Sequence, residues 1–327
     1  MARELALNPQ HVALEALMAD YGGCLSPIQY GGILTENLAV RHGAGLFDMS
    51  SNALVGISGH RAFDFLTALS ATDVSPLRDG QACQAVLCDK DGGVIDSFRT
   101  YPLLGGVVCV ISPITAPETL NYLKTEAAER DLELRFAERN ADQVLLEFHG
   151  PSSKEILRKL KAHSSLLYAQ PDTTGTWMIA GTPIAVAASR ALRVKGFELF
   201  VPRLSAPSIW LQLLRGGATP CGLAAYETLR IEAGQFKFGS ELTRDVPFSS
   251  ARERIIGLKS DIKGIFTAGQ AVYAGGVQRG VITSGTTSPA LSGSVAMALM
   301  EPGAKAPFEV GYRTKRRPVE QAEIPFV

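Results

Sequence analysis

The chain contains little cysteine, and its cysteines show no pattern of a disulfide or metal framework. Its 327 residues include five cysteines, an odd number scattered along the sequence. Small folds that depend on disulfides or zinc need paired or closely spaced cysteines, so both classes are disfavoured. We therefore expect a protein of the reducing cytoplasm.

Excess charge of one sign and long apolar runs are missing as well. The 32 basic and 32 acidic residues cancel to a formal net charge of zero, which argues against a protein that binds nucleic acid through phosphate contacts. No apolar run approaches the roughly 18–20 residues that cross a bilayer, and the first residues lack the apolar stretch of a signal peptide. We expect neither nucleic-acid nor membrane partners.

What is present is typical of a globular α+β protein of more than one domain. Hydrophobic residues make up 46% of the chain and charged residues 20%, which excludes a disordered chain. Residues 8–22 are predicted as one helix that two glycines end, and Thr115 with Glu118 predicts a capping box at the start of a later helix. From Arg252 onward, closely spaced strand patterns predict a small β-barrel.

Histidine does not indicate a catalytic or metal site. None of the histidines stands in the spacing of a metal-binding motif, so we expect no metal, and no histidine is expected to supply a proton to a substrate. They are His11, His42, His60, His149 and His163.

Five segments, in order, resemble the glycine-cleavage T-protein (aminomethyltransferase) family. They cover most of the chain, and their shared order is more specific than any one of them alone. The segments are IQYGGILTENLAVRHGAGLFDMS, DKDGGVIDSFRTYPL, KGFELFVP, PCGLAAYETLRIEAG and GVITSGTTSPALSGSVAMAL.

The resemblance implies a fold and a cofactor. It implies three subdomains arranged as a cloverleaf around a central channel that holds tetrahydrofolate, with a β-barrel at the C-terminal end. The expected boundaries are residues 1–45 with 141–250 for the folate-binding subdomain, 46–140 for a second α/β subdomain, and 251–327 for the barrel.

Glu198 is the residue that the resemblance assigns to the pterin ring. A carboxylate offers two acceptors to the adjacent N–H and NH2 donors of a pterin, which makes a charge-assisted pair. The alternative is a strand glutamate that points at water, since the flanking Phe197 and Leu199 suit a strand buried on its other face. The resemblance also places Tyr101 and Ser112 among the cofactor-binding residues.

The hairpin segment GGVIDSF departs from the family pattern. The aminomethyltransferases carry two aspartates there, and the second lies near the folate nitrogens; here Asp96 keeps the first position and Ser97 takes the second. Neighbouring strand residues face opposite sides, so Asp96 cannot replace the missing charge without a bulge. Asp96 and Ser97 are candidate catalytic residues, and a surface aspartate near a turn is the alternative for Asp96.

Further departures concern the group that is transferred. Tyr226 stands where the aminomethyltransferases have an arginine, and Ser112 replaces an asparagine, while Arg230 is expected to brace the fold through ion pairs. We infer a tetrahydrofolate-dependent transferase that moves a methyl-type group from a small donor to tetrahydrofolate, with Tyr226 in its active site. The alternatives are a non-catalytic folate-binding or regulatory protein and a glycine-cleavage aminomethyltransferase, whose lipoyl carrier partner the substitutions disfavour.

Overall fold

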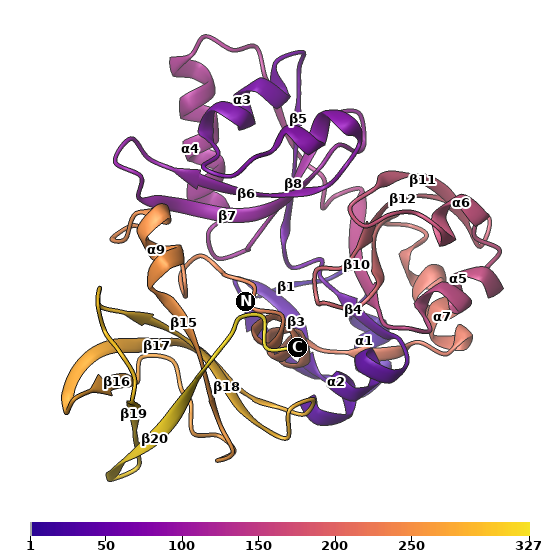
Figure 1. Cartoon of the computed structure of the whole chain (residues 1–327). Coiled ribbons are helices and arrows are strands. Elements are labelled where there is room, and N and C mark those ends of the chain that lie inside the picture. Colours follow the sequence, from indigo (N-terminus) through magenta and orange to yellow (C-terminus); the bar gives the residue numbers. More distant parts are fainter. Residues whose placement is uncertain (1) are drawn as a thin grey trace. The chain divides into compact units, whose positions relative to one another are not determined.

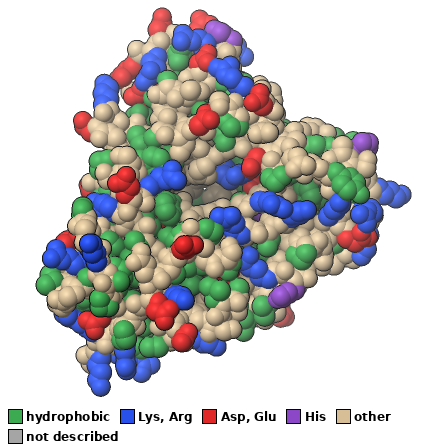
Figure 2. Space-filling view, viewed as in Figure 1, with side chains coloured by type: hydrophobic (Ala, Val, Ile, Leu, Met, Phe, Trp, Pro, Cys, Tyr) green, Lys and Arg blue, Asp and Glu red, His purple; other side chains and the backbone are tan. Residues whose placement is uncertain are grey.

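A computed structural model describes residues 2–327, and it divides into two compact units (Figure 1). No helix of the described chain combines the length and apolarity that a membrane crossing requires. Acidic and basic side chains are interspersed over the face seen in Figure 2, as expected for a chain without net charge. The first unit comprises the residues up to Leu87, Asp96–Arg190 and Val194–Tyr226; the second comprises Cys88–Ile95, Ala191–Arg193 and Glu227–Val327.

A six-stranded mixed sheet forms the centre of the first unit, in the order β11-β12-β13-β10-β4-β14. Side chains alternate across its two faces, and one face carries buried apolar residues such as Leu146, Phe148 and Leu199. Helices α5 (Ser153–Lys159), α6 (Ser164–Leu167) and α7 (Ala206–Gly216) contribute to the same apolar core, as does Leu7 directly before helix α1 (Asn8–Ala13). The strands are β4 (Gly45–Asp48), β10 (Gln143–His149), β11 (Thr174–Ile179), β12 (Thr182–Ser189), β13 (Gly196–Pro202) and β14 (Thr219–Cys221).

The helix predicted over residues 8–22 is wrong in its second half. Helix α1 ends at Ala13, and β2 (Leu17–Tyr21) then pairs antiparallel with β3 (Cys24–Gln29), which also pairs with β1 (Arg3–Glu4). The two glycines form the turn of a hairpin instead of a helix end. The apolar positions in this stretch were too few to specify a helix, and strand pairing decided the local structure. Helix α2 (Ile33–His42) follows.

A five-stranded sheet in the order β6-β7-β8-β5-β9 is built largely from the hairpin region. Figure 1 shows helices α3 and α4 on one side of β6 and β7. Glycine-containing turns join β6 to β7 and β7 to β8. The elements are β5 (Ala53–Ser58), α3 (Ala62–Leu69), the 3-10 helix η1 (Ser75–Asp79), β6 (Cys83–Cys88), β7 (Val94–Tyr101), β8 (Val107–Ile111), α4 (Ala116–Glu129) and β9 (Arg135–Glu138).

Asp96 ties strand β7 to helix α4. Thr115 does not form the predicted capping box with its side chain; its hydroxyl donates to Oδ2 of Asp96 at 2.8 Å, and that of Thr119 donates to the same atom at 2.6 Å. The backbone N–H of Ser97 donates to Oδ1 at 2.7 Å. Asp96 is 1% exposed, so it is not a surface aspartate. Burial raises the pKa of its carboxyl, and the two threonine hydroxyls partly offset that rise.

The second unit contains the predicted C-terminal barrel, which is closed in the order β15-β18-β17-β16-β19-β20. Arg230 braces this unit: its guanidinium pairs with Glu227 at 2.8 Å and Glu241 at 3.1 Å, and donates to Ser284 Oγ at 2.8 Å. Its elements are the end of α8 (Leu223–Glu232), α9 (Phe248–Arg254), β15 (Ile255–Ser260), β16 (Ala271–Ala274), β17 (Val277–Ser288), β18 (Gly293–Met300), β19 (Phe308–Tyr312) and β20 (Lys315–Ala322).

The contact between β7 and α4 gives a first testable prediction. Replacing Thr119 by valine keeps the shape of the side chain and removes one donor from the buried Asp96 carboxyl. We expect a loss of about 1.5–3 kcal/mol in the free energy of unfolding, the range for a hydrogen bond to a charged group. Urea denaturation measures it, with Thr67→Val as the control, because the Thr67 hydroxyl bonds a carbonyl on the exposed surface of α3. Equal stability of the two variants would contradict this role of Asp96.

Candidate active site

The second face of the six-stranded sheet carries polar side chains that are nevertheless buried. Phe148 and Phe197 point into the apolar core, so Glu147, His149 and Glu198 lie on the opposite face. Strands β10 and β13 pair with Glu147 directly opposite Glu198. Two carboxylates therefore lie side by side where water is largely excluded, and such an arrangement needs compensating partners.

Glu198 has partners at only one of its two oxygens. Its Oε1 accepts a hydrogen bond from the Ser189 hydroxyl at 2.8 Å and forms an ion pair with Nε of Arg99 at 3.4 Å. No group among residues 2–327 hydrogen-bonds its Oε2, although the side chain is 1% exposed. The alternative of a strand glutamate that points at water is therefore wrong. An acceptor of this kind is available to a ligand with N–H donors.

Strand β7 supplies the cation that accompanies Glu198. The Arg99 guanidinium donates to Asp172 at 2.8 Å, and its Nε donates to the Tyr101 hydroxyl at 3.3 Å. The Tyr101 ring packs edge-on against Phe200, with centroids 5.0 Å apart. Sequence reasoning placed Tyr101 in the site and missed Arg99. The signal was available, because Arg99 lies two residues from both Ser97 and Tyr101 and so shares their face of the strand.

Glu147 connects two further groups. The Tyr226 hydroxyl donates to its Oε1 at 3.2 Å, and Nε2 of His149 lies 2.9 Å from its Oε2. His149 lies on the same face as the two glutamates, although no histidine was named among the candidate site residues; the expectation that no histidine supplies a proton to a substrate stays a prediction. The sequence signal was their spacing: Glu147 and His149 are two residues apart in a strand whose intervening Phe148 is apolar.

A glycine makes room for the His149 ring. Gly196 lies opposite His149 in the β10–β13 pair, and a Cβ at that position would stand 2.1 Å from Nδ1 of the imidazole. Any larger residue would have to displace either the ring or the strand. The glycine that precedes Phe197 and Glu198 thus fixes where the histidine lies.

Burial dominates the acid–base behaviour of this cluster. It raises the pKa of the Glu198 carboxyl; the adjacent Arg99 guanidinium lowers that pKa and the charge of Glu147 raises it further. The pKa of Tyr226 is raised well above its usual range, first by burial and then by the charges of Glu147 and Glu198. Both tyrosine hydroxyls, that of Tyr101 included, therefore stay protonated near neutral pH.

The other predicted site residues lie around β7. Ser97 shares the face of Arg99 and Tyr101 and is partly buried, whereas Asp96 points to the opposite face and is held by helix α4. Ser112 directly follows β8, in which Val110 pairs with Arg99, so it lies toward the Ser97 end of β7. The structure does not bring the Asp96 carboxylate together with Glu198, and a catalytic role for Asp96 stays a prediction.

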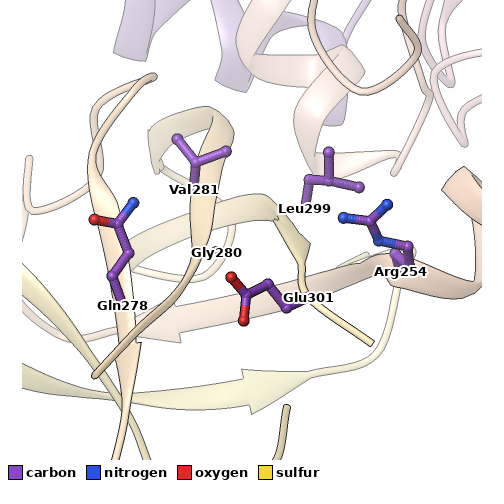
Figure 3. A pocket seen from close by; sticks show the side chains of 6 residues that line it. All are labelled: Arg254, Gln278, Gly280, Val281, Leu299 and Glu301. Carbon is purple, nitrogen blue, oxygen red and sulfur yellow. The ribbon is translucent and has the colours of Figure 1, made fainter. Parts of the chain in front are cut away.

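A separate hollow lies on the barrel and has a cavity volume of about 450 Å³. Figure 3 shows its lining side chains. Nε of Arg254 donates to the carbonyl of Met300 at 2.8 Å, and Glu301 pairs with Arg279 at 3.0 Å. The charged groups here thus have protein partners, and none of the predicted site residues lines this hollow.

Two models of known protein families match this chain. The family model described as "GCVT N-terminal domain" matches residues 7–259, and that described as "Glycine cleavage T-protein C-terminal barrel domain" matches residues 253–327. The chain belongs to the glycine-cleavage T-protein family. The resemblance seen in the sequence is thereby confirmed.

Relatives match over nearly the whole length. An aminomethyltransferase of Rubrobacter xylanophilus is 31% identical, with 99% of this chain and 94% of the relative covered. One from Thermus thermophilus is 32% identical, with 99% of both chains covered. The crystal structure of the glycine cleavage system aminomethyltransferase T from Bartonella henselae matches with a TM-score of 0.87 at 24% identity, covering 100% of this chain and 98% of that one. The α+β class and the C-terminal barrel are confirmed.

Family membership also bears on the expected activity. It identifies the chain as a member of a family of folate-dependent one-carbon transferases and supports tetrahydrofolate as the expected cofactor. The relatives carry the name of the alternative that the sequence analysis kept open, aminomethyltransferase, and they support it better than the preferred methyl-type reading.

The close approach of Gly196 to His149 gives a second prediction. Gly196→Ala should destabilise the fold by about 1–3 kcal/mol, because the added methyl group must displace the imidazole or the strand. Thermal and urea denaturation measure the change. Gly31→Ala is the control, since a Cβ there meets no atom within 4 Å. If both variants were equally stable, His149 would not be confined by Gly196.

Proposed function

We propose that this protein transfers a one-carbon group to tetrahydrofolate and acts in the cytoplasm. The observation that carries the proposal is the buried Oε2 of Glu198, which has no hydrogen-bond partner among residues 2–327. The pterin ring of tetrahydrofolate presents an N–H and an NH2 side by side, and a carboxylate acceptor fits such donors. When bound, tetrahydrofolate supplies the nitrogen that accepts the one-carbon group.

Each site residue of the first unit would have a separate role in holding or orienting the bound molecules. Glu198 holds the pterin, and Arg99 with Ser189 keeps its carboxylate ionised and oriented by occupying Oε1. Tyr101 is held by Arg99 and Phe200 beside that carboxylate. Ser97 and Ser112 offer hydroxyls near the same end of β7, and Tyr226 presents its phenol from helix α8.

For the donor, we propose an aminomethyl group presented by a lipoyl carrier protein. The full-length similarity to aminomethyltransferases supports it. The sequence argued against such a donor because Ser97 and Tyr226 lack charge. Glu147 weakens that objection: it adds a second carboxylate to the site, bound to the Tyr226 hydroxyl, and a carboxylate can stabilise the positive charge of an aminomethyl group.

A cationic methyl donor is the second candidate. The Tyr226 ring packs edge-on against Phe47, with centroids 5.4 Å apart, and aromatic rings attract methylated cations. Ser97 and Tyr226 are the residues that favour this reading.

Replacing Glu198 by glutamine tests the folate site. The variant keeps the shape and removes the charge, so we expect the dissociation constant for tetrahydrofolate to rise about 10- to 150-fold, which corresponds to about 1.5–3 kcal/mol. Calorimetry of the full-length protein measures it. Glu155→Gln is the matched control, because Glu155 lies on the exposed surface of α5 and pairs with Arg158.

The raised pKa of Glu198 also predicts a pH dependence. A proton competes with the ligand for the carboxylate, so wild-type affinity should increase as the pH rises through the raised pKa of Glu198. The Glu198→Gln variant should lack that increase. Unchanged affinity in the variant would show that Glu198 does not hold the pterin.

A donor panel tests the transferred group. We expect methylenetetrahydrofolate from an aminomethyl-loaded lipoyl carrier at a rate of about 1–1,000 per second, and no methyltetrahydrofolate from sulfonium or quaternary ammonium compounds. The reverse pattern would establish the second candidate. Binding of tetrahydrofolate without turnover of any donor would favour a folate-binding protein.

A further inference from the structure

Three side chains form a series through Glu147. The Tyr226 hydroxyl donates to Oε1 of Glu147 at 3.2 Å, and Nε2 of His149 lies 2.9 Å from Oε2. Glu147 is 6% and His149 0% exposed. The series therefore runs from a helix residue, Tyr226, to the interior of strand β10. The pterin contact proposed for Glu198 uses neither Glu147 nor His149.

The fold does not require a carboxylate at position 147. The residues beside Glu147 and Glu198 in the same row of the sheet are Phe47 of β4 and Ala187 of β12, both buried and apolar. Burying a carboxylate costs free energy that hydrogen bonds only partly return. Among residues 2–327, no arginine or lysine pairs with Glu147. Burial of the Glu147 carboxylate has this cost, and its only hydrogen-bonding partners in the described part of the chain are a phenol and an imidazole. This indicates that Glu147 has a chemical role.

The charged groups around Glu147 are paired with other residues, so the Glu147 carboxylate is available to accept a proton from Tyr226. Glu198 faces it from β13, and Arg99 and Tyr101 approach from β7. Arg99 is engaged by Glu198 and Asp172, so its charge does not neutralise Glu147. Ser189 of β12 donates to Glu198.

The direction of the hydrogen bonds leaves one end of the series open to a ligand. Tyr226 is partly exposed, unlike Glu147 and His149. Because its proton points to Glu147, the phenol oxygen keeps lone pairs with which it can accept another proton. Its pKa is raised by burial and by the charge of Glu147, so the phenol does not ionise by itself and can only exchange one proton for another.

We propose that Tyr226, Glu147 and His149 form the proton relay of the one-carbon transfer site. The proposal rests on the function proposed above. Tyr226 is the catalytic residue that touches the reacting molecule. Glu147 acts through Tyr226, and His149 acts through Glu147, so both are positioning residues.

The proton balance of the transfer explains why a relay is needed. When a secondary amine forms a bond to the transferred carbon, the bond from that carbon to the donor breaks, and its electron pair leaves with the donor. The amine nitrogen must then lose a proton. That proton passes to the Tyr226 oxygen while the proton of Tyr226 passes to Oε1 of Glu147. The reverse movement delivers this proton to the departing sulfur. A second nitrogen of the acceptor then bonds to the same carbon, the bond from that carbon to the amino nitrogen breaks, and the proton of the second nitrogen leaves with ammonia.

Glu147→Gln and Tyr226→Phe test the relay in the full-length protein, with tetrahydrofolate and the aminomethyl-loaded lipoyl carrier as substrates. We expect kcat to fall about 10²- to 10⁴-fold in each, the usual contribution of general acid–base catalysis. The KM for the carrier and the dissociation constant for tetrahydrofolate should change less than about threefold. Combining the two substitutions should cost no more than either alone, because they interrupt one path. Glu155→Gln is the matched surface control.

Rescue by a conservative variant separates positioning from a merely structural role. His149→Leu removes a donor from the Glu147 carboxylate, so kcat should fall while the dissociation constant for tetrahydrofolate changes less than about threefold. His149→Gln keeps a donor of similar reach and should restore kcat toward that of the wild type.

A second readout requires no substrate. Because the charge of Glu147 raises the pKa of both Tyr226 and Tyr101, Glu147→Gln should let these tyrosines ionise at lower pH in an ultraviolet absorbance titration. Adding Tyr226→Phe should remove the part of this change that belongs to Tyr226. Circular dichroism establishes that each variant is folded, and Tyr226→Phe, which loses only a hydroxyl, remains a test if Glu147→Gln does not fold.

The possible failures are distinguishable. If the wild type turns over but Tyr226→Phe keeps its kcat within about threefold, the relay is wrong and the proposed function stands. An unshifted tyrosine titration in Glu147→Gln would also overturn the relay. If the wild type neither binds tetrahydrofolate nor turns over, the proposed function fails and the relay with it.

Discussion

The structure of the site depends on the burial of two carboxylates directly opposite each other on neighbouring strands. Glu147 and Glu198 would repel in a medium of low dielectric constant, so each must be stabilised separately. Glu198 has the guanidinium of Arg99 and the hydroxyl of Ser189, and Glu147 has the phenol of Tyr226 and the imidazole of His149. The five-stranded sheet supplies Arg99, the six-stranded sheet supplies Ser189 and His149, and helix α8 supplies Tyr226, so the two glutamates hold the elements of the site together.

The two glutamates also differ in what they can offer a ligand. Glu198 keeps one oxygen without a protein partner, whereas both oxygens of Glu147 are occupied. The first is arranged as a binding group and the second as part of a hydrogen-bonded chain. This difference arises from the partners of each residue, since the two residues are chemically identical and both are buried.

The sequence predicted the larger features and missed contacts between distant segments. Family motifs were enough to identify the fold, and strand patterns were enough to predict the barrel, because each is a local signal. The sequence could not join Glu147 and His149 to Glu198 and Arg99, since these contacts depend on the pairing of β10 with β13 and on the approach of β7. The helix predicted over residues 8–22 failed for the same reason: pairing with β3 decided its second half.

Strand β7 serves the fold with one face and the site with the other. Asp96 faces helix α4, whereas Ser97, Arg99 and Tyr101 face the candidate active site. The two faces follow from the alternation of side chains along a strand. A single residue inserted into or deleted from this strand would exchange the side chains between its two faces. The Arg99 guanidinium would then lie in the apolar layer, and the hydrogen bonds of Asp96 to helix α4 would be lost. Divergence in this strand is therefore restricted to exchanging side chains at fixed length, and new donor specificities can arise there by substitution at alternate positions without any change in the scaffold.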